Sequence, residues 1–237
     1  SSVVSRSQTL QPRQLPLSIG LDDDMTRDNW LSREATAALE QWLFADHGPA
    51  YVGGESGVGK SHLLQALCHR TAGALYLPLA ELLEMPPMAL LEGTEGAPLL
   101  AIDGLEVIVG RPDWQEALFH LFNRAQQTQT RLVMSGQLAP GALSELLPDM
   151  RSRLEALPLF ALPRFSEAAL DALLQLRAQR RGMKLSAEVR GWLLRRAPRN
   201  PAPLMQMLGE LDRESLARGR PITIPLLNEL RLLSQGQ

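Results

Sequence analysis

Residues 54–61 read Gly-Glu-Ser-Gly-Val-Gly-Lys-Ser and match the whole of the phosphate-binding pattern G-x-x-x-x-G-K-[ST]. In such a loop the glycines let successive backbone N–H groups turn toward a polyphosphate, the lysine reaches the outer phosphates and the serine hydroxyl ligates Mg²⁺. The apolar run before the loop is typical of a strand end and the apolar spacing after it is typical of a helix, which disfavours a glycine-rich turn that binds nothing. We expect contacts to a nucleoside polyphosphate from Gly54, Glu55, Ser56, Gly57, Val58, Gly59, Lys60, Ser61 and His62.

The composition is that of an ordinary globular protein. Hydrophobic residues make up 45% of the 237 residues and charged residues 21%, which suffices for a substantial core. No apolar run approaches the ~18 residues that a membrane span needs, and the polar N-terminus does not resemble a signal peptide. The single cysteine, Cys68, excludes an internal disulfide framework and is expected in the core. We expect a cytoplasmic protein without membrane contact.

The net charge of −2 conceals an uneven distribution along the chain. Residues 1–163 carry 11 basic and 19 acidic side chains, whereas residues 164–237 carry 13 basic and 7 acidic ones. The basic C-terminal segment either faces phosphates or an acidic partner, or is a solvated helical surface rich in arginine.

Short apolar runs alternate with segments of helical periodicity in the middle of the chain. This alternation predicts an α/β fold of the P-loop NTPase class, with three layers: a parallel sheet and helices on both of its faces. Ser32 is expected as the N-cap of the first helix. The expected strands are Ala50–Gly53, Ala74–Pro78, Leu99–Asp103, Arg131–Ser135 and Leu157–Leu162, with helices near 32–43, 61–71, 79–92, 114–128 and 142–153.

Two flanking segments lack this alternation. Residues 1–27 contain two prolines and the acidic triplet Asp22-Asp23-Asp24 without regular periodicity, so we expect an extended, mobile arm. From Ser166 onward the periodicity is helical throughout, which predicts a small helical bundle. We therefore divide the chain into an arm (1–27), a nucleotide-binding domain (28–163) and a helical domain (164–237).

The second half of the expected site is the apolar strand Leu99–Asp103, which ends in a carboxylate. If this strand lies beside the phosphate loop, Asp103 reaches the magnesium side of the phosphates and holds Mg²⁺ together with Ser61. Hydrolysis also needs a group that orients the attacking water, usually a carboxylate directly after this aspartate. The next residue is Gly104, and Glu106 serves only if the strand continues. The sequence thus supports nucleotide binding better than turnover.

Arg153 is a second candidate for catalytic work, near the end of an expected helix. A permanently charged guanidinium at the edge of a domain can act in trans on the γ-phosphate of a neighbouring protein, as an arginine finger. From charge alone, an ordinary surface salt bridge is the more common role for such a residue.

With these residues placed, the chain resembles the AAA+ ATPase module of the DnaA family, and within that family it looks most like the short regulators of the Hda group. The match extends from about Arg13 to Leu233, nearly the whole chain. Apart from the phosphate loop, each matching piece is short and weak alone. The pieces are Gln14–Ile19, the phosphate loop, Leu100–Asp103, Leu121–Arg124, Ser152–Leu154, Leu211–Ser215 and Ile222–Pro225.

The resemblance implies a function. Regulators of this kind hold ADP or ATP, dock on the DNA polymerase sliding clamp (its β subunit) and stimulate ATP hydrolysis by DnaA, which negatively regulates the initiation of replication. Arg153 falls at the family's arginine-finger position. The arm becomes a clamp-binding peptide of the form Q-L-x-L-x-[LI], comprising Gln14, Leu15, Pro16, Leu17, Ser18 and Ile19.

The resemblance also limits the partners. The helix-turn-helix domain with which DnaA reads DNA is absent, so direct sequence-specific DNA binding is not expected. Modules of this family meet side by side, which is compatible with a homo-oligomer. Two alternatives stay open: a self-sufficient ATPase that uses Glu106, and a DNA-bound initiation or helicase-loading factor of the same family.

Three residues depart from the family pattern. Gly104 replaces an acidic residue, Gln137 stands where an aspartate often senses phosphate, and Ala202 falls at the sensor arginine of the helical lid. Arg199 is close enough in sequence to substitute for that arginine. Loss of the lid arginine removes a charge-assisted contact to the γ-phosphate, so discrimination between ATP and ADP should weaken. All three departures predict a protein that holds nucleotide with weak or no intrinsic ATPase activity.

Overall fold

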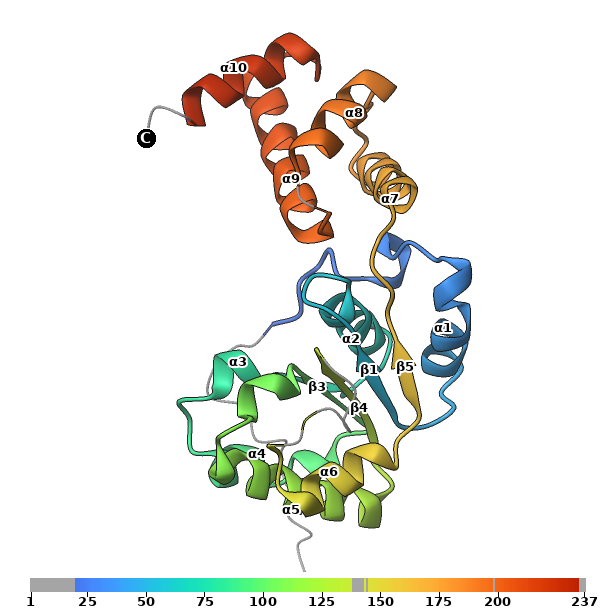
Figure 1. The fold of residues 1–237 in the computed structure, drawn as a ribbon, viewed down its shortest axis with the longest axis vertical. Coiled ribbons are helices and arrows are strands. Elements are labelled where there is room, and N and C mark those ends of the chain that lie inside the picture. The colour runs from blue at the N-terminus through green and yellow to red at the C-terminus, as the bar shows by residue number, and fades with distance from the viewer. Residues whose placement is uncertain (1–19, 138–142, 144, 198, 235–237) are drawn as a thin grey trace, which may run out of the picture.

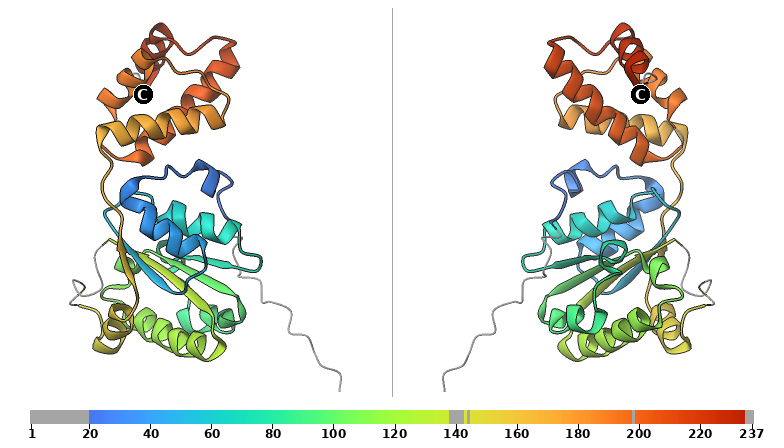
Figure 2. Two further views of the ribbon diagram at one scale, coloured as in Figure 1. Left: turned by 90° about the vertical axis from the view of Figure 1, so that its right-hand side faces the viewer. Right: turned by 90° about the vertical axis from the view of Figure 1, so that its left-hand side faces the viewer.

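The structure is a computed structural model that describes residues 20–137, 143, 145–197 and 199–234, with side chains described as far as residue 230. The chain forms a sheet-containing module and a helical domain stacked along the long axis of the molecule (Figure 1). Figure 2 shows the two parts from either side. Residues 20–36, called the N-terminal segment from here on, lie between the helical domain and the sheet. The predicted clamp-binding residues Gln14–Ile19 lie outside the described residues.

The module is built on one five-stranded parallel sheet. Its spatial order is β2-β3-β4-β1-β5, so the strand before the phosphate loop lies beside β4 and the strand that ends in Asp103 lies on the other side of β4. The strands are β1 (Ala50–Gly53), β2 (Leu75–Pro78), β3 (Leu99–Asp103), β4 (Arg131–Gly136) and β5 (Leu159–Ala161). The predicted parallel α/β sheet is confirmed.

Alternate residues of the buried strands point to opposite faces of the sheet, which explains its two helical layers. Val52 and Ala101 pack in one core, under α1 (Ala37–Phe44) and α2 (Lys60–His69). Tyr51 and Ile102 pack in the other core. That second core is covered by α3 (Leu79–Leu82), α4 (Pro87–Leu91), α5 (Pro112–Thr128) and α6 (Pro148–Glu155). Strands buried on both faces read as continuous apolar runs, as the sequence of β3 does.

The helical domain follows β5 and has a core of its own. Three of its helices begin at a residue whose side chain accepts a hydrogen bond from the first turn: Ser166, Ser186 and Asn200. Leu174 and Leu204 are fully buried between the helices. The helices are α7 (Glu167–Arg180), α8 (Ala187–Arg196), α9 (Pro201–Arg218) and α10 (Ile224–Ser234).

Several expected element boundaries are wrong, for local reasons. The helix expected at 79–92 is two short helices, because Pro86 and Pro87 cannot continue the first one. The helix expected near 142–153 begins at Pro148, with proline at its first turn. Ser32 is not a helix cap: its hydroxyl donates to Glu40 Oε1 at 2.5 Å, and the 3₁₀ turn η2 (Glu34–Thr36) precedes α1.

The acidic triplet is not part of a free arm, contrary to expectation. The Asp22 N–H donates to Gln65 Oε1 on α2 at 2.8 Å, and the Asp22 carbonyl lies 2.8 Å from His69 Nε2. Asp24 pairs with Arg181 on α7 at 3.3 Å. This segment continues into the 3₁₀ turn η1 (Arg27–Asn29) and connects α2 with the helical domain. Across the described part of the chain, no helix combines the length and apolar character that a bilayer crossing requires.

Candidate nucleotide-binding site

The predicted phosphate loop connects β1 to α2 at the carboxyl edge of the sheet. Gly57 and Gly59 have φ angles of +83° and +107°, which L-residues with side chains rarely adopt. A Cβ on Gly59 would lie 2.7 Å from the Trp30 ring, and one on Gly57 would overlap the Asn200 side-chain amide. The glycines of the motif therefore allow both the loop conformation and the close approach of the N-terminal segment and the helical domain.

Lys60 is the first residue of α2, and its ammonium group lies against the main chain of the loop. The side chain is buried, and Nζ donates to the Gly54 and Glu55 carbonyls, the latter at 3.1 Å. Burial lowers the pKa of Lys60, while the Glu106 and Asp103 carboxylates oppose that shift. A desolvated ammonium group held by main-chain oxygens is placed to bind a phosphate oxygen that enters the loop.

Asp103 lies at the end of β3, where its carboxylate accepts hydrogen bonds from three hydroxyl groups. Ser61 Oγ donates to Asp103 Oδ2 at 2.5 Å, and the Tyr76 and Ser135 hydroxyls donate to the same carboxylate. Burial, with the nearby Asp103 charge, raises the pKa of Tyr76, so this phenol stays a donor. The sequence brought Ser61 and Asp103 to notice, but not Tyr76 or Ser135. Their only sequence signal is a polar residue within or at the end of an apolar strand.

The Ser61–Asp103 pair fits the coordination chemistry of Mg²⁺. A serine hydroxyl and a carboxylate are hard oxygen donors, and Mg²⁺ in nucleotide sites usually takes one or two protein oxygens, with phosphates and water completing the octahedron. Within the described residues, no group of three or more His, Cys, Asp or Glu side chains could hold a metal. A cation at this position would therefore depend on the nucleotide for most of its ligands.

A catalytic role for Glu106 was expected only if β3 continued to it, and β3 ends at Asp103. Gly104 has a φ of +88° and turns the chain into η4 (Leu105–Ile108). This turn nevertheless brings the Glu106 carboxylate to the site: Oε2 accepts from the Gln137 N–H at 3.2 Å, and its charge acts on Lys60. Glu106 reaches the site by a 3₁₀ turn rather than along a strand.

A cavity of about 550 Å³ lies over these groups, between the module and the helical domain. Its size is in the range of small-molecule sites. A second hollow, of about 450 Å³ beside α1, contains none of the phosphate-loop residues. The walls of the first cavity come from four places: the N-terminal segment (Met25, Asn29, Trp30), the loop and α2 (Ser56, Gly57, Gly59, Lys60, Ser61, His62), the strand ends (Tyr76, Asp103, Glu106, Gln137) and the helical domain (Phe165, Leu173, Arg177, Pro201, Ala202, Met205).

Three predicted residues of the loop do not line the cavity. Val58 is buried in the core under α2, and Gly54 closes the end of β1 against Leu162. The Glu55 carboxylate turns outward and accepts from Arg164 at 2.6 Å and 2.5 Å, in the link to the helical domain. None of the three contributes a side chain to the cavity.

The N-terminal segment forms a buried wall around His62. The Thr26 carbonyl lies 2.6 Å from His62 Nε2, and the Trp30 ring meets the imidazole edge-on with centroids 5.4 Å apart. Burial lowers the pKa of His62. Asn29 Nδ2 donates to the Asp24 carbonyl at 2.8 Å, which fixes the amide orientation. Within the described part of the chain, Asn29 Oδ1 and Trp30 Nε1 are buried without a hydrogen-bond partner, and both residues line the cavity.

The link between β5 and α7 is held by Arg33. Its guanidinium lies over the Phe165 ring at 4.1 Å from the centroid and donates to the carbonyls of Pro163 and Arg164, at 3.4 Å and 3.2 Å. The helical domain is thus attached to the module by a braced segment.

Gln137 and Ala202, the two departures at sensor positions, both line the cavity, whereas Arg199 is exposed and does not. The structure thus does not place Arg199 where it could substitute for the lid arginine. The helical domain instead brings Arg177, on α7, to the cavity. Sequence reasoning missed Arg177 because nothing in the helical periodicity separates it from the other arginines of α7.

Arg153 lies on α6 and is not among the residues that line the cavity. Its guanidinium donates to Gln126 Oε1 at 2.9 Å and to Asn123 Oδ1, and lies 5.8 Å from the centroid of the Phe119 ring. Among the described residues it makes no ion pair, so the salt-bridge alternative is not what the structure shows. Neutral amides orient the guanidinium without neutralising its charge.

Comparisons with known protein families match two adjacent parts of the chain. Residues 91–157, which carry Asp103 and Arg153, match the model of the bacterial DnaA ATPase domain. Residues 167–230, which form most of the helical domain, match the model of the Hda lid domain.

Solved structures with the same fold include the replication initiation protein DnaA and the branch migration motor RuvB. Domain III of the Thermotoga maritima initiator DnaA superposes with a TM-score of 0.74 at 20% identity, over 87% of this chain and 95% of that one. The AMPPCP-bound DnaA of Aquifex aeolicus gives 0.68 at 18% identity, over 81% of this chain and 66% of that one. The Thermotoga maritima RuvB A156S variant gives 0.63 at 15% identity, over 88% and 72%. These likenesses establish the fold.

The parallel sheet, the helical lid and the two family matches thus agree. This chain belongs to the Hda/DnaA-related AAA+ family, with a module of the DnaA type and a lid of the Hda type.

Proposed function

We propose that this protein binds ADP or ATP with Mg²⁺ between its module and its lid, docks on the DNA polymerase sliding clamp and stimulates ATP hydrolysis by DnaA through Arg153. In this role it is a negative regulator of replication initiation and acts mainly on the active site of a partner. The observation that carries the proposal concerns Arg153. Its charged guanidinium is held by the neutral amides of Asn123 and Gln126 and does not line the nucleotide cavity of this chain.

Nucleotide binding is supported by the groups around the loop. Lys60 supplies a buried ammonium, Ser61 and Asp103 offer oxygen ligands to Mg²⁺, and the cavity is open between them and the lid. The nucleotide analogue AMPPCP is bound by the Aquifex aeolicus DnaA that shares this fold.

The arginine-finger role is supported by geometry and charge. The amide oxygens of Asn123 and Gln126 each accept from one terminal nitrogen of Arg153, which fixes the plane of the guanidinium. Such a preoriented cation at an edge of the module can complete the γ-phosphate pocket of a neighbour at little entropic cost. The developing charge on that phosphate is then stabilised by a group from outside the partner.

The test of this role is Arg153→Ala in a reconstituted reaction with the clamp, DNA and ATP-bound DnaA, following ADP production. We expect nucleotide binding by the variant to be unchanged and stimulation to fall roughly 10³-fold or to background, as for other arginine fingers. Arg151→Ala is the matched control, because Arg151 lies on the same helix but is paired with Glu155 at 3.7 Å. Stimulation retained by Arg153→Ala, or lost equally in both variants, would remove the assignment.

Clamp docking by the segment Gln14–Ile19 is proposed from its sequence. An extended peptide with proline loses little entropy on binding, its alternate apolar residues enter clefts and its glutamine supplies a directional amide. Combined Gln14→Ala and Leu17→Ala substitution should abolish clamp pull-down and leave the melting temperature unchanged. Clamp retention at the wild-type level would contradict the proposal.

A self-sufficient ATPase is the second candidate, and the position of Glu106 favours it. The carboxylate lines the cavity close enough to act electrostatically on Lys60. Its hydrogen bond from the Gln137 N–H orients it, and a carboxylate there could orient a water. Steady-state turnover without DnaA separates the candidates: a rate of about 1 s⁻¹ or more that Glu106→Gln abolishes would favour the ATPase.

A further inference from the structure

We propose that Arg177, on the first helix of the lid, is the cation through which the lid holds the phosphates of a bound nucleotide. The proposal rests on the proposed nucleotide binding and names the lid residue that takes part in it. It places the positive charge of the lid on α7, whereas the sensor position of the family on α9 is occupied here by Ala202.

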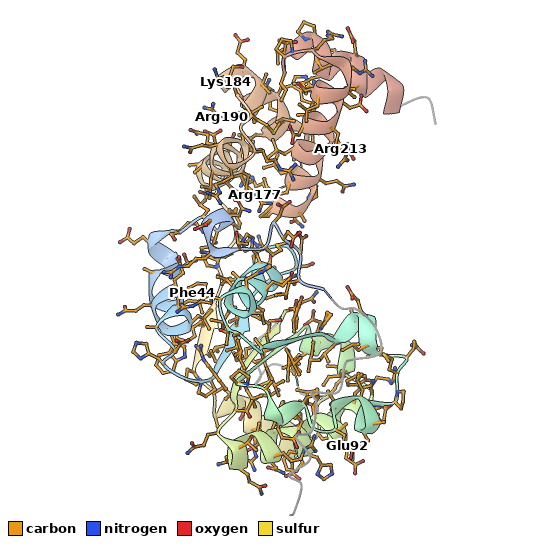
Figure 3. All side chains as sticks on the ribbon, turned by 180° about the vertical axis from the view of Figure 1, so that it is seen from behind. Phe44, Glu92, Arg177, Lys184, Arg190 and Arg213 are labelled. Atoms are coloured by element: carbon orange, nitrogen blue, oxygen red, sulfur yellow. The ribbon has the colours of Figure 1, made fainter. Side chains whose placement is uncertain are left out.

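Arg177 lies where the lid meets the module (Figure 3). Arg177 is only 8% exposed, and it lines the cavity together with Leu173 and Phe165. Among the described residues that line this cavity, the side chains with a full positive charge at neutral pH are Lys60 on the module side and Arg177 on the lid side. Arg199, the other arginine considered for this role, is exposed outside it.

The guanidinium of Arg177 is incompletely paired within the described part of the protein. Its one ion pair there is to Asp24, with the nearest atoms 4.0 Å apart, and none of the described hydrogen bonds involves it. Asp24 lies closer to Arg181, at 3.3 Å. A guanidinium has five N–H donors, and in a largely buried side chain they gain free energy when acceptors pair with them. The cavity is therefore the place from which acceptors for Arg177 would come.

Phosphate oxygens match these donors. Guanidinium groups bind phosphate through two parallel hydrogen bonds, and the bonds are charge-assisted. The charge of Arg177 also acts on His62, which directly follows Ser61 at the start of α2. Arg177 and His62 both line the cavity. Ala202 brings no charge to the cavity, so Arg177 supplies the positive charge on the lid side.

The test is titration calorimetry of ADP and of ATP, each with Mg²⁺, into the full chain. Arg177→Ala should weaken the binding of both nucleotides by about tenfold or more, the usual effect of losing hydrogen bonds to a charged group. Arg177→Lys should recover part of the loss, because it keeps the charge without the two parallel bonds. Thermal unfolding without nucleotide establishes that each variant is folded.

Arg181→Ala and Asp24→Asn are the matched controls. Arg181 shares Asp24 with Arg177 but does not line the cavity. If Arg177 binds phosphate, Arg181→Ala should leave ADP affinity within about twofold, and Asp24→Asn should leave it unchanged or tighten it, because a competing anion is removed. An equal loss in Arg177→Ala, Arg181→Ala and Asp24→Asn would overturn the proposal, because Arg177 would then only attach the N-terminal segment to the lid.

Two other results have distinct meanings. Wild-type protein that takes up neither ADP nor ATP would contradict the proposed function itself. Wild-type binding that is matched within twofold by Arg177→Ala would leave the proposed function in place and overturn the inference about the lid.

Discussion

The two sides of the cavity are built in different ways. On the module side, Lys60 and Ser61 are neighbours in one loop whose conformation is set by its own glycines. On the lid side, Arg177 and Ala202 come from two helices, and only the packing of α7 against α9 brings them to one surface. A contiguous loop carries its geometry in its sequence, whereas an assembled surface does not.

The two sides also differ in what holds them. The loop follows β1, every residue of which is buried, and precedes a helix packed in the same core. The lid and the N-terminal segment are joined by ion pairs at or near the surface, such as Arg180–Asp28 at 3.5 Å and Arg181–Asp24 at 3.3 Å. Exposed ion pairs are weak and screened by salt, so the lid side should be the more adjustable one.

The largest expected effect is on the module side. Lys60→Met removes the buried ammonium but keeps the aliphatic chain, and we expect ADP and ATP affinity to fall roughly 100-fold or more. The free energy of unfolding without ligand should not fall, because burial of the charge is unfavourable to begin with. Calorimetry and urea unfolding measure the two quantities. A lid variant with a larger loss of affinity than Lys60→Met would reverse the comparison.

A second prediction concerns the contact between the loop and the N-terminal segment. Gly59→Ala adds a Cβ that would lie 2.7 Å from the Trp30 ring at a φ of +107°. We expect it to lower the free energy of unfolding by about 1–3 kcal/mol and to weaken nucleotide binding. Gly93→Ala is the control, because Gly93 has a φ of +79° with nothing within 4 Å of the added atom. Equal destabilisation of the two variants in urea would show that the Trp30 contact contributes nothing.

The third prediction concerns pH. Because burial lowers the pKa of His62 in the folded protein, the unfolded chain binds a proton first as the pH falls. The contribution of His62 to stability is therefore complete above about pH 6.5 and decreases as the pH falls toward its folded pKa, by at most about 1.4 kcal/mol per pH unit. His62→Gln should flatten this part of the urea-unfolding profile between pH 8 and pH 5. The exposed His120, changed in the same way, serves as control; a flattening of equal size there would contradict the assignment.

The smallest expected effect is on the lid side. Ala202→Arg restores an arginine at the lid's sensor position and should raise the preference for ATP over ADP by about threefold to tenfold. The gain is limited because the new cation lies in the first turn of α9, where the helix dipole opposes it. The ratio of the two dissociation constants measures this. Tightening of both nucleotides by one factor would mean that the arginine does not reach the γ-phosphate.

The buried parts of the fold could be predicted from sequence, and the exposed parts less well. The strands Ala50–Gly53 and Leu99–Asp103 have the predicted bounds, since burial on both faces produces an unbroken apolar run. The edge strand β5 is shorter than predicted and half exposed, so its sequence carries less information. Pro86 and Pro87 divide the helix predicted at 79–92, because proline cannot continue a helix even where the apolar periodicity runs across it.

The same contrast holds for the candidate site. The proximity of Ser61 and Asp103 could be anticipated, because parallel strands bring their carboxyl ends to one edge. Their roles as nucleotide and Mg²⁺ ligands stay predictions. Tyr76, Asn200 and Arg177 could not be anticipated, since each reaches the site through tertiary packing between segments far apart in the sequence.

The link that joins β5 to α7 has a mechanical consequence. The Glu55 carboxylate accepts a hydrogen bond from Arg164. Arg33 donates to the carbonyls of Pro163 and Arg164, and its guanidinium lies over the Phe165 ring. If the segment between β5 and α7 were flexible, small displacements of the phosphate loop would not reach the helical domain. Because Arg33 and Glu55 both contact this link, we expect a shift of the loop backbone to displace the start of α7 as well.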